Sequence, residues 1–308
     1  MSNLAIIMYH YVRPIKGSKF PKIKGLELDG FHRQLDYLQD RYNFVTVDEI
    51  NYAIKSGKGL KGNSCWLTFD DGYKDHHQYV MPALVERGIE GAFFPPSATV
   101  TDEKLLDVNA IHHILASVND TSALKNDLDQ ICLLYGVKRD LLFNLWNKYG
   151  KANRFDTPEV IYIKRLLQHA LPAEIRHNIC EQLFQKYMGM NMQGFASQLY
   201  MNKQEIIDLR NNGMAIGSHG SEHYWLNSIS AERQREDINA SLVFLEEIGV
   251  PIQDWVMCYP YGGFNDVTLK ILSDLGASIG ITTESRLANL ASDHPLTLPR
   301  FDTNDFPQ

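Results

Sequence analysis

The sequence has few of the features that mark disulfide-rich, membrane-spanning or nucleic-acid-binding proteins. Its four cysteines lie far apart with no Cys-x-x-Cys pair, so neither a thiolate zinc site nor a dense disulfide framework is expected. No apolar run has the length of a transmembrane helix. With 30 Lys and Arg against 37 Asp and Glu, the chain lacks the basic excess that neutralises phosphates, and no nucleic-acid partner is expected.

The amino-terminal residues also lack the features of a secretory leader. Residues 1–12 contain no basic region and no small-residue cleavage site, and His10 interrupts their apolar run. This pattern is typical of a first strand and predicts a cytoplasmic protein. The 308 residues, 44% apolar and 22% charged, are enough for one well-buried domain with an insertion.

Short apolar runs that end in polar or glycine-rich residues predict the strands of a mainly parallel sheet. They are residues 5–12, 66–69, 91–94, 214–217, 255–259, 278–282 and 296–301. Helical patterns at 31–40 and 231–248 lie between them, so the fold class is α/β, and the many short strands favour a closed or nearly closed barrel.

Residues 101–200 differ from the rest because helical patterns follow one another there without a strong strand. We therefore expect two parts: residues 1–100 and 201–308 form the α/β domain, and 101–200 form an α-helical insertion. The insertion is either a lid that forms one wall of the site or a dimerisation or stabilising element. The sequence does not specify the oligomeric state.

Three groups of residues, each at the end of an apolar run, are candidates for chemistry. The first is Leu67–Tyr73, where Asp70 and Asp71 precede a glycine that permits a turn and so lets both carboxylates face one site. One carboxylate then suits a metal and the other suits a base. The alternative is a loop in which an aspartate simply caps the next helix.

The second group is Ile216–His223, in which His219 and His223 are four residues apart. On a helical turn both imidazoles lie on one face and can bind one divalent ion; the alternative is a helix start with incidental histidines. Asp plus two His leaves coordination positions open for water and substrate. The third group, Val256–Gly263, is a strand ending in a rigid turn that either aims backbone N–H groups at an oxyanion or is an ordinary connection.

In this order and spacing, the three groups resemble the motifs of the polysaccharide deacetylases, carbohydrate esterase family 4 of the NodB-homology superfamily. The resemblance rests on Thr68–Gly72, Ser218–His223 and Tyr259–Gly262, and leaves the helical insertion outside it. It implies a distorted (β/α) barrel of about seven strands with its site at the carboxyl ends of the strands. It also implies that Asp70 is the general base.

By the same resemblance, Asp71, His219 and His223 hold a divalent metal, and Tyr261 contributes its backbone N–H to the oxyanion hole. Zinc is the favoured ion, and nickel, cobalt and iron are compatible with these ligands. Cys258 stands where many members have an arginine that orients the base. Arg300 is the candidate replacement, because an arginine on another strand can hold a carboxylate bidentately; a solvent-facing ion pair is the alternative.

The general acid has two candidates. His294 lies in a polar loop near the carboxyl end, where many members carry the acid histidine. His10 is preferred, because Met8–Val12 resembles the opening Tyr-His motif of exopolysaccharide deacetylases of the biofilm type. The alternative for His10 is a buried structural histidine.

The resulting hypothesis is a metal-dependent hydrolase that removes an acyl group, most often acetyl, from the amide of an amino sugar in cell-surface polysaccharide biosynthesis. A cytoplasmic location favours a sugar nucleotide or a lipid-linked glycan as substrate. Trp225 is a candidate for stacking on a sugar face. The alternatives are a deacylase of a non-carbohydrate C–N amide and a catalytically silent carbohydrate-binding relative.

Overall fold

The computed structural model describes residues 3–153 and 156–308, and the chain forms two compact units. Unit 1 comprises Met1–Pro14, Gly25–Glu103 and Ser197–Gln308, and unit 2 comprises Ile15–Lys24 and Lys104–Ala196. Unit 2 therefore contains a second segment that the sequence analysis had assigned to the α/β domain. The reason is local packing, because Ile15 and Ile23 are buried and Lys22 Nζ donates to the carbonyl of Val118 at 2.9 Å.

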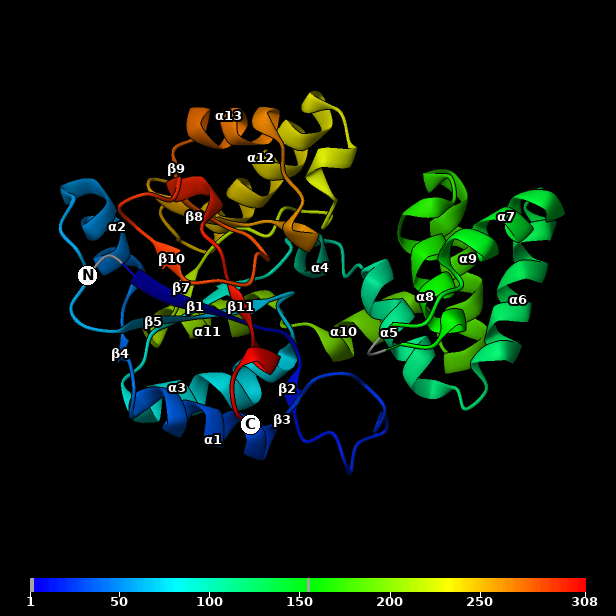
Figure 1. Cartoon of the computed structure of the whole chain (residues 1–308), viewed down its shortest axis with the longest axis horizontal. Helices are drawn as coiled ribbons and strands as arrows, with labels where there is room; N and C mark the ends of the chain where they lie inside the picture. Colours follow the sequence, from blue (N-terminus) through cyan, green and yellow to red (C-terminus); the bar gives the residue numbers. More distant parts are fainter. Residues whose placement is uncertain (1–2, 154–155) are drawn as a thin grey trace. The chain divides into compact units, whose positions relative to one another are not determined.

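The strands of the structure all belong to unit 1 (Figure 1). They are β1 (Asn3–Tyr9), β2 (Val12–Arg13), β3 (Leu26–Glu27), β4 (Asn43–Phe44), β5 (Ser64–Asp70), β6 (Gly91–Phe94), β7 (Ala215–Ile216), β8 (Trp255–Cys258), β9 (Ala277–Ile281), β10 (Ala288–Asn289) and β11 (Phe301–Asp302). The main sheet has the order β10-β1-β5-β6-β7, with β11 paired to β1 and β4 paired to β5, while β8 and β9 pair with each other.

The parallel pairings follow one another in a circuit. β7 continues to Ser218, which is bridged to Met257 of β8, and Ile281 of β9 is bridged to Leu298. The same segment then forms β11, where Phe301 pairs with Ile7 of β1. Because single bridges complete the circuit at two places, the architecture is a distorted α/β barrel, as the sequence predicted.

Helices of unit 1 cover the outside of this barrel, with α1 and α3 on one side and α12 and α13 on another (Figure 1). These helices are α1 (Leu28–Gln39), α2 (Val47–Ser56), α3 (Met81–Arg87), α4 (Ala98–Thr101), α11 (Lys203–Asn211), α12 (Ala231–Glu247) and α13 (Asp266–Asp274). Several begin at side-chain caps: Asn202, for example, accepts the N–H of Glu205, whose carboxylate accepts the N–H of Asn202.

Unit 2 is helical. Its helices are α5 (Asp107–Ser117), α6 (Thr121–Leu134), α7 (Arg139–Tyr149), α8 (Pro158–Arg165), α9 (Ala173–Met188) and α10 (Met192–Leu199), the last of which ends in unit 1. Apolar residues of α5, α6, α8 and α9 form its core, among them Ile111, Leu124, Tyr162 and Leu183, all fully buried. In the described part of the chain, no helix is long and apolar enough to span a membrane.

Alternation along the strands explains where the site lies. On β5, Cys65, Leu67 and Phe69 pack against the helices, whereas Trp66 packs in a second cluster with residues of β1, β6, β8 and β9 inside the barrel. Asp70 has the same parity as Trp66 and so ends β5 on the inner side. The apolar interior thus becomes polar at the carboxyl ends of the strands.

One predicted strand, residues 296–301, is wrong over most of its length. Pro295–Thr297 form a 3₁₀ turn, and only Phe301–Asp302 are strand. Pro295 has a fixed φ and no N–H, and Leu296 donates its N–H to the His294 side chain, so these residues start a turn and not a ladder. Leu298 again pairs with a neighbouring strand, through its bridge to Ile281 of β9.

Candidate metal and catalytic site

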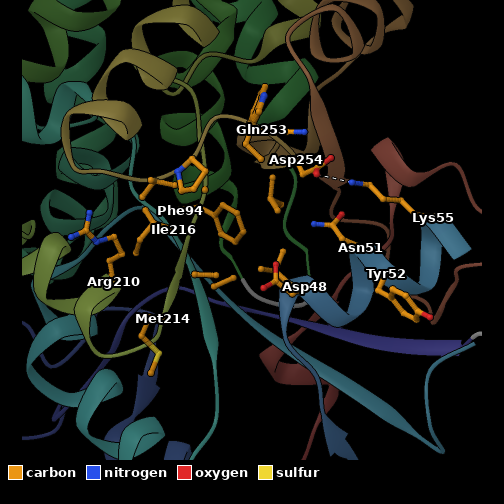
Figure 2. Close-up of a pocket in the computed structure, with 18 residues that line it drawn as sticks. Asp48, Asn51, Tyr52, Lys55, Phe94, Arg210, Met214, Ile216, Gln253 and Asp254 are labelled. Carbon is orange, nitrogen blue, oxygen red and sulfur yellow. Dashed lines mark hydrogen bonds and ion pairs between the residues drawn. The ribbon is translucent and has the colours of Figure 1, made fainter.

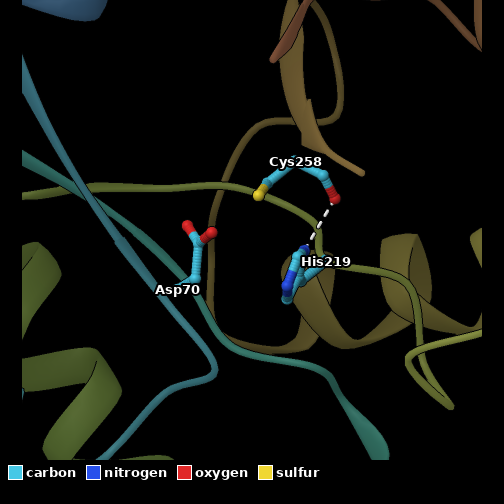
Figure 3. Close-up of side chains that lie close together, drawn as sticks. All are labelled: Asp70, His219 and Cys258. Carbon is cyan, nitrogen blue, oxygen red and sulfur yellow. Dashed lines mark hydrogen bonds between the residues drawn. The ribbon is translucent and has the colours of Figure 1, made fainter. Parts of the chain in front are cut away.

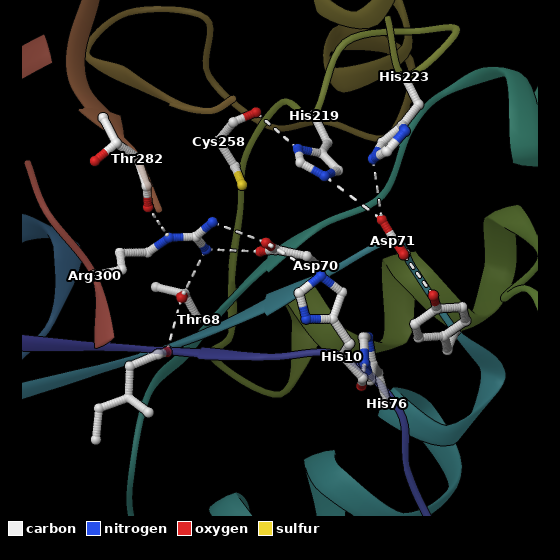
Figure 4. Close-up of polar contacts among 12 residues, drawn as sticks. His10, Thr68, Asp70, Asp71, His76, His219, His223, Cys258, Thr282 and Arg300 are labelled. Atoms are coloured by element: carbon white, nitrogen blue, oxygen red, sulfur yellow. Dashed lines mark hydrogen bonds and ion pairs between the residues drawn. The ribbon is translucent and has the colours of Figure 1, made fainter. Parts of the chain in front are cut away.

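The polar residues predicted from the motifs lie together at the carboxyl ends of the parallel strands (Figure 4). In the figure these are His10 after β1, Asp70 and Asp71 at the end of β5, and His219 and His223 after β7. Tyr261 follows β8, and Arg300, just before β11, reaches Asp70 with its side chain. Because parallel strands end at the same edge of a barrel, residues far apart in the sequence meet there.

Asp71, His219 and His223 form a buried cluster of potential metal ligands. Asp71 Oδ1 lies 3.5 Å from His219 Nε2 and 3.4 Å from His223 Nε2. One ligand atom from each residue lies within 4.8 Å of the others. Three nitrogen and oxygen donors from a carboxylate and two imidazoles fit a zinc-type site that keeps a position open.

The tautomer of His219 is set by its second nitrogen. His219 Nδ1 lies 2.7 Å from the carbonyl oxygen of Cys258, and a carbonyl can only accept, so Nδ1 carries a proton. In a neutral ring, Nε2 then presents its lone pair toward Asp71. Such a backbone partner is typical of histidines that bind metals.

The electrostatics of the cluster favour a positive charge. Burial opposes ionisation of Asp71, but the adjacent His219 and His223 side chains outweigh it and hold the pKa of Asp71 well below its usual range. Burial also disfavours a charged His219, yet Cys258 and Asp71 raise the pKa of His219 well above its usual value. Asp71 Oδ2 accepts the hydroxyl of Tyr73, so Oδ1 is the oxygen that faces the imidazoles.

The two histidines do not lie on a helical turn, and this part of the sequence analysis was wrong. Residues 219–225 form an irregular loop in which Gly220 has a φ of 69° and His223 a φ of 58°. The physical reason is an anchor on α12: Asp237 accepts the N–H groups of Ser221 at 3.2 Å and Glu222 at 2.7 Å. In a helix these two N–H groups would donate to backbone carbonyls, but here they donate to the Asp237 carboxylate.

Asp70 and Arg300 form a buried bidentate ion pair. Arg300 Nη1 donates to Asp70 Oδ1 and Nη2 to Oδ2, both at 2.9 Å, and the two side chains are 0% and 2% exposed. Arg300 also donates to the carbonyl of Thr282 and the hydroxyl of Thr68. Burial would raise the pKa of Asp70, but Arg300 and His219 outweigh it and lower the pKa to about 2.

Cys258 stands beside this pair and completes a second potential ligand group with Asp70 and His219 (Figure 3). This group fits a metal less well. Burial raises the pKa of the Cys258 thiol, and a protonated sulfur is a poor ligand. Asp70 already uses both oxygens on Arg300.

His10 lies beside Asp70, with its Nε2 4.0 Å from Asp70 Oδ2 and its side chain 42% exposed. Its carbonyl accepts a hydrogen bond from Nε2 of the buried His76. Burial lowers the pKa of His76 to about 4, so this ring is a neutral donor at pH 7. His294, the other candidate acid, accepts the N–H of Leu296 and caps its own turn.

Tyr261 lies next to the ligand cluster in a left-handed conformation with a φ of 57°. Its ring contacts the His223 ring edge-to-face at 4.7 Å and the Trp225 ring at 5.0 Å. The third motif therefore borders the second. The sequence assigned no role to Tyr73, His76 or Asp237, because their hydrogen bonds to motif residues appear only in the folded chain.

Fold and site define an α/β-barrel protein with an Asp-His-His cluster at the carboxyl ends of its strands. Solved deacetylases share this fold at low sequence identity. The chain is similar to Streptococcus pyogenes deacetylase PplD in complex with acetate, with a TM-score of 0.61, 16% identity, and coverage of 97% of this chain and 92% of that chain. It is also similar to IcaB from Ammonifex degensii (TM-score 0.58, 17% identity, 98% and 92% covered). The BpsB deacetylase domain from Bordetella bronchiseptica gives a TM-score of 0.57 at 12% identity, with 98% and 96% covered.

Sequence comparison points to the same family. The family model described as polysaccharide deacetylase matches residues 178–280, which include the second and third motifs. A Bacillus subtilis (strain 168) protein named "Putative polysaccharide deacetylase YxkH" is 26% identical over 90 residues, which are 29% of this chain and 32% of that protein. The match thus spans about a third of the relative. The resemblance to the polysaccharide deacetylase family predicted from the motifs is confirmed by these findings.

The anchor on α12 generates a first prediction. Asp237→Ala should weaken zinc binding about 10- to 100-fold, because the loop that carries both histidines loses the carboxylate that accepts its two backbone N–H groups. Zinc affinity is measured on metal-free protein by competition with a chromophoric chelator. Glu236→Ala, on the exposed side of the same helix, is the matched control and should bind zinc like the parent protein. Equal affinities in both variants, with unchanged circular dichroism, would contradict the anchor.

The Asp70–Arg300 pair generates a second prediction. Because the pKa of Asp70 is lowered in the folded state, the pair stabilises the fold above pH 4, and this stabilisation is lost as the pH falls through about 2. In Arg300→Gln the largest opposing charge is gone, so burial raises the pKa of Asp70. The variant should lose about 3–5 kcal/mol of unfolding free energy at pH 7, and the deficit should shrink as the pH falls toward 4.

Chemical denaturation at a series of pH values measures this deficit. Arg286→Gln is the control, because Arg286 is half-exposed and pairs with Glu284 and Asp293 on the surface. Its loss should cost under about 1 kcal/mol at any pH. A deficit for Arg300→Gln that is equally small, or that does not depend on pH, would show that the buried pair is not what holds Asp70 ionised.

Proposed function

We propose that the protein is a metal-dependent hydrolase that removes the N-acyl group, in the first instance acetyl, from an amino sugar. The observation that carries the proposal is the convergence of Asp71 Oδ1, His219 Nε2 and His223 Nε2 beside a carboxylate that is held ionised by Arg300. The set combines ligands for one ion with an acid-base pair at the same end of the barrel. The family match supports this class of reaction.

Asp71, His219 and His223 would hold the ion, with zinc favoured and nickel, cobalt and iron compatible. A divalent ion supplies Lewis-acid chemistry there, polarising the amide carbonyl and making water easier to deprotonate. Asp71 offers Oδ1, because Oδ2 accepts the Tyr73 hydroxyl. His219 keeps the required tautomer through the carbonyl of Cys258.

Asp70 acts as the general base in this mechanism. It accepts a proton from the water that attacks the acyl carbon, and Arg300 keeps both of its oxygens in a fixed orientation. A carboxylate with a low pKa is a weak base, so Asp70 gives up the proton that it took from water as the amine departs. His10, 4.0 Å from Asp70 and partly exposed, is placed to give the leaving nitrogen a proton.

Tyr261 would direct its backbone N–H at the developing oxyanion. The adjacent rings of Tyr261 and Trp225 offer a surface on which a sugar face can stack, beside the ligand His223. This arrangement favours a carbohydrate over a small non-carbohydrate amide. A sugar nucleotide or a lipid-linked glycan of surface-polysaccharide assembly remains the proposed substrate form, and a cytoplasmic location remains a prediction of the sequence.

The proposal is tested by metal content and acetate release together. Protein purified without added metal should contain close to one equivalent of a transition metal, and His219→Ala should lose it. Acetate release is then measured on N-acetylated sugars, oligosaccharides and sugar nucleotides. Asp70→Asn should keep the metal and lose at least about 100-fold of the rate, because the base is removed while Asp71, His219 and His223 stay in place.

Metal binding without acetate release from any acetylated sugar would refute the sugar deacetylase and move the non-carbohydrate amide substrate forward. A protein that neither contains nor takes up metal would favour a silent binding relative. Those outcomes separate the three functional classes that the sequence leaves open.

The identity of the acid is a separate prediction. His10→Ala should lower acetate release about 100-fold or more, because His10 is the partly exposed histidine beside Asp70, whereas the nearby His219 is a proposed metal ligand. His294→Ala should change the rate little, since His294 caps a turn. If the effects of the two substitutions were reversed, the acid role would move to His294.

A further inference from the structure

A second cavity lies in the barrel wall where β7 and β8 diverge (Figure 2). It has a volume of about 530 Å³. Above it, the single bridge between Ser218 and Met257 joins the two strands. Its walls come from β6, β7, the start of β8 and one face of α2, with lining residues that include Asn51, Phe94, Ile216, Gln253 and Val256.

Most of the cavity is displaced from the reaction centre along the strand axis, and of its floor residues Phe94 alone is level with Asp70, its register partner on β5. It is lined by Ala92 near the start of β6, Met214 just before β7, and Trp255 at the start of β8. Asp70 and Cys258 are the last residues of their strands. Since the strands are parallel, the cavity opens toward the amino-terminal end of the barrel and the ligand cluster lies at the carboxyl end.

The cavity floor is apolar and its charges are balanced. Phe94, Ile216 and Val256 are buried side chains of the floor. The rim has two acids, Asp48 and Asp254, and two bases, Lys55 and Arg210; Lys55 pairs with Asp254 at 2.6 Å. Arg210 donates to the carbonyl of Ile248 and the side chain of Asn211.

Two side-chain amides remain available for a ligand. Within the described residues, Asn51 on α2 and Gln253 before β8 make no side-chain hydrogen bond, and both line the cavity. Each amide supplies donors and an acceptor. The cavity therefore offers an apolar floor, uncharged hydrogen-bonding groups and no net charge.

From this combination we infer that the cavity binds an uncharged, N-acetylated sugar unit of the glycan, apart from the reaction centre, an inference that rests on the proposed function. The volume is in the range of small-ligand sites. An acetamido methyl suits the apolar floor, and its amide and the ring hydroxyls suit Asn51 and Gln253. A deacetylated unit carries an ammonium group, which the balanced rim does not favour, so the cavity distinguishes acetylated from deacetylated glycan.

The test uses cysteine protection, because all four native cysteines are buried. Asn51→Cys places a reactive thiol at the cavity, and Ser56→Cys, at the exposed end of the same helix, is the matched control. Both are made in the Asp70→Asn background so that the probe is not consumed. The probe is N,N′-diacetylchitobiose, compared with the fully deacetylated glucosamine dimer, and maleimide labelling rates are measured.

Saturating diacetylchitobiose should slow labelling of the cysteine at position 51 at least about threefold and leave the cysteine at 56 unchanged, and the glucosamine dimer should protect less. Gln253→Cys, which repeats the test from another wall, covers the case in which loss of the Asn51 amide itself weakens binding. The inference is overturned if diacetylchitobiose slows labelling at neither position 51 nor position 253, or if it slows labelling at position 56 equally.

The proposed function is scored separately, by acetate release from the parent protein. Protection at the cavity without any acetate release would refute the hydrolase and leave the cavity standing. Acetate release with no protection would refute the cavity alone.

Discussion

The buried ion pair between Asp70 and Arg300 is the interaction on which the fold and the proposed chemistry both depend. Two charged groups without exposure to water are costly unless their geometry is good, and here each carboxylate oxygen has its own guanidinium partner. Arg300 also bonds to Thr68 of β5 and to the carbonyl of Thr282 after β9. One side chain thus fixes the base and connects three segments of the barrel.

Around this pair, backbone groups define the chemistry of the side chains. The carbonyl of Cys258 fixes the tautomer of His219, and the carbonyl of His10 accepts from the neutral His76. The hydroxyl of Tyr73 leaves one oxygen of Asp71 for the histidines. None of these partners reacts, yet each restricts a ligand or a catalytic group to one state, which is how a preorganised site differs from a set of nearby residues.

Much of the site could be predicted because its motifs end strands. Parallel strands bring their carboxyl ends together, so Asp70, Asp71 and His219 meet whatever the length of chain between them. Arg300 could be proposed because the resembled family has an arginine where Cys258 stands, and an arginine on another strand can hold a carboxylate bidentately. The loop of His219 and His223 could not be predicted, since its shape depends on Asp237, which lies on a later helix.

Prediction of the fold depended in the same way on whether a local sequence pattern marks an element. The apolar run 66–69 was recognised because its strand, β5, is buried on both faces, whereas the two-residue strands β2, β3 and β4 have no pattern that a sequence can show. Residues 15–24 were assigned to the α/β domain as part of residues 1–100, and only their packing places them with unit 2. Tertiary contacts, and not local pattern, decided each of these cases.

The pairing of β1 with β11 has a consequence for the order of synthesis. β1 is synthesised long before its neighbour β11, and Arg300 follows Asp70 by 230 residues. During translation the barrel therefore stays open along one edge of β1, and Asp70 lacks its counter-charge. The buried pair is completed only when Arg300 has been synthesised, so shorter nascent chains carry Asp71, His219 and His223 beside an unpaired Asp70.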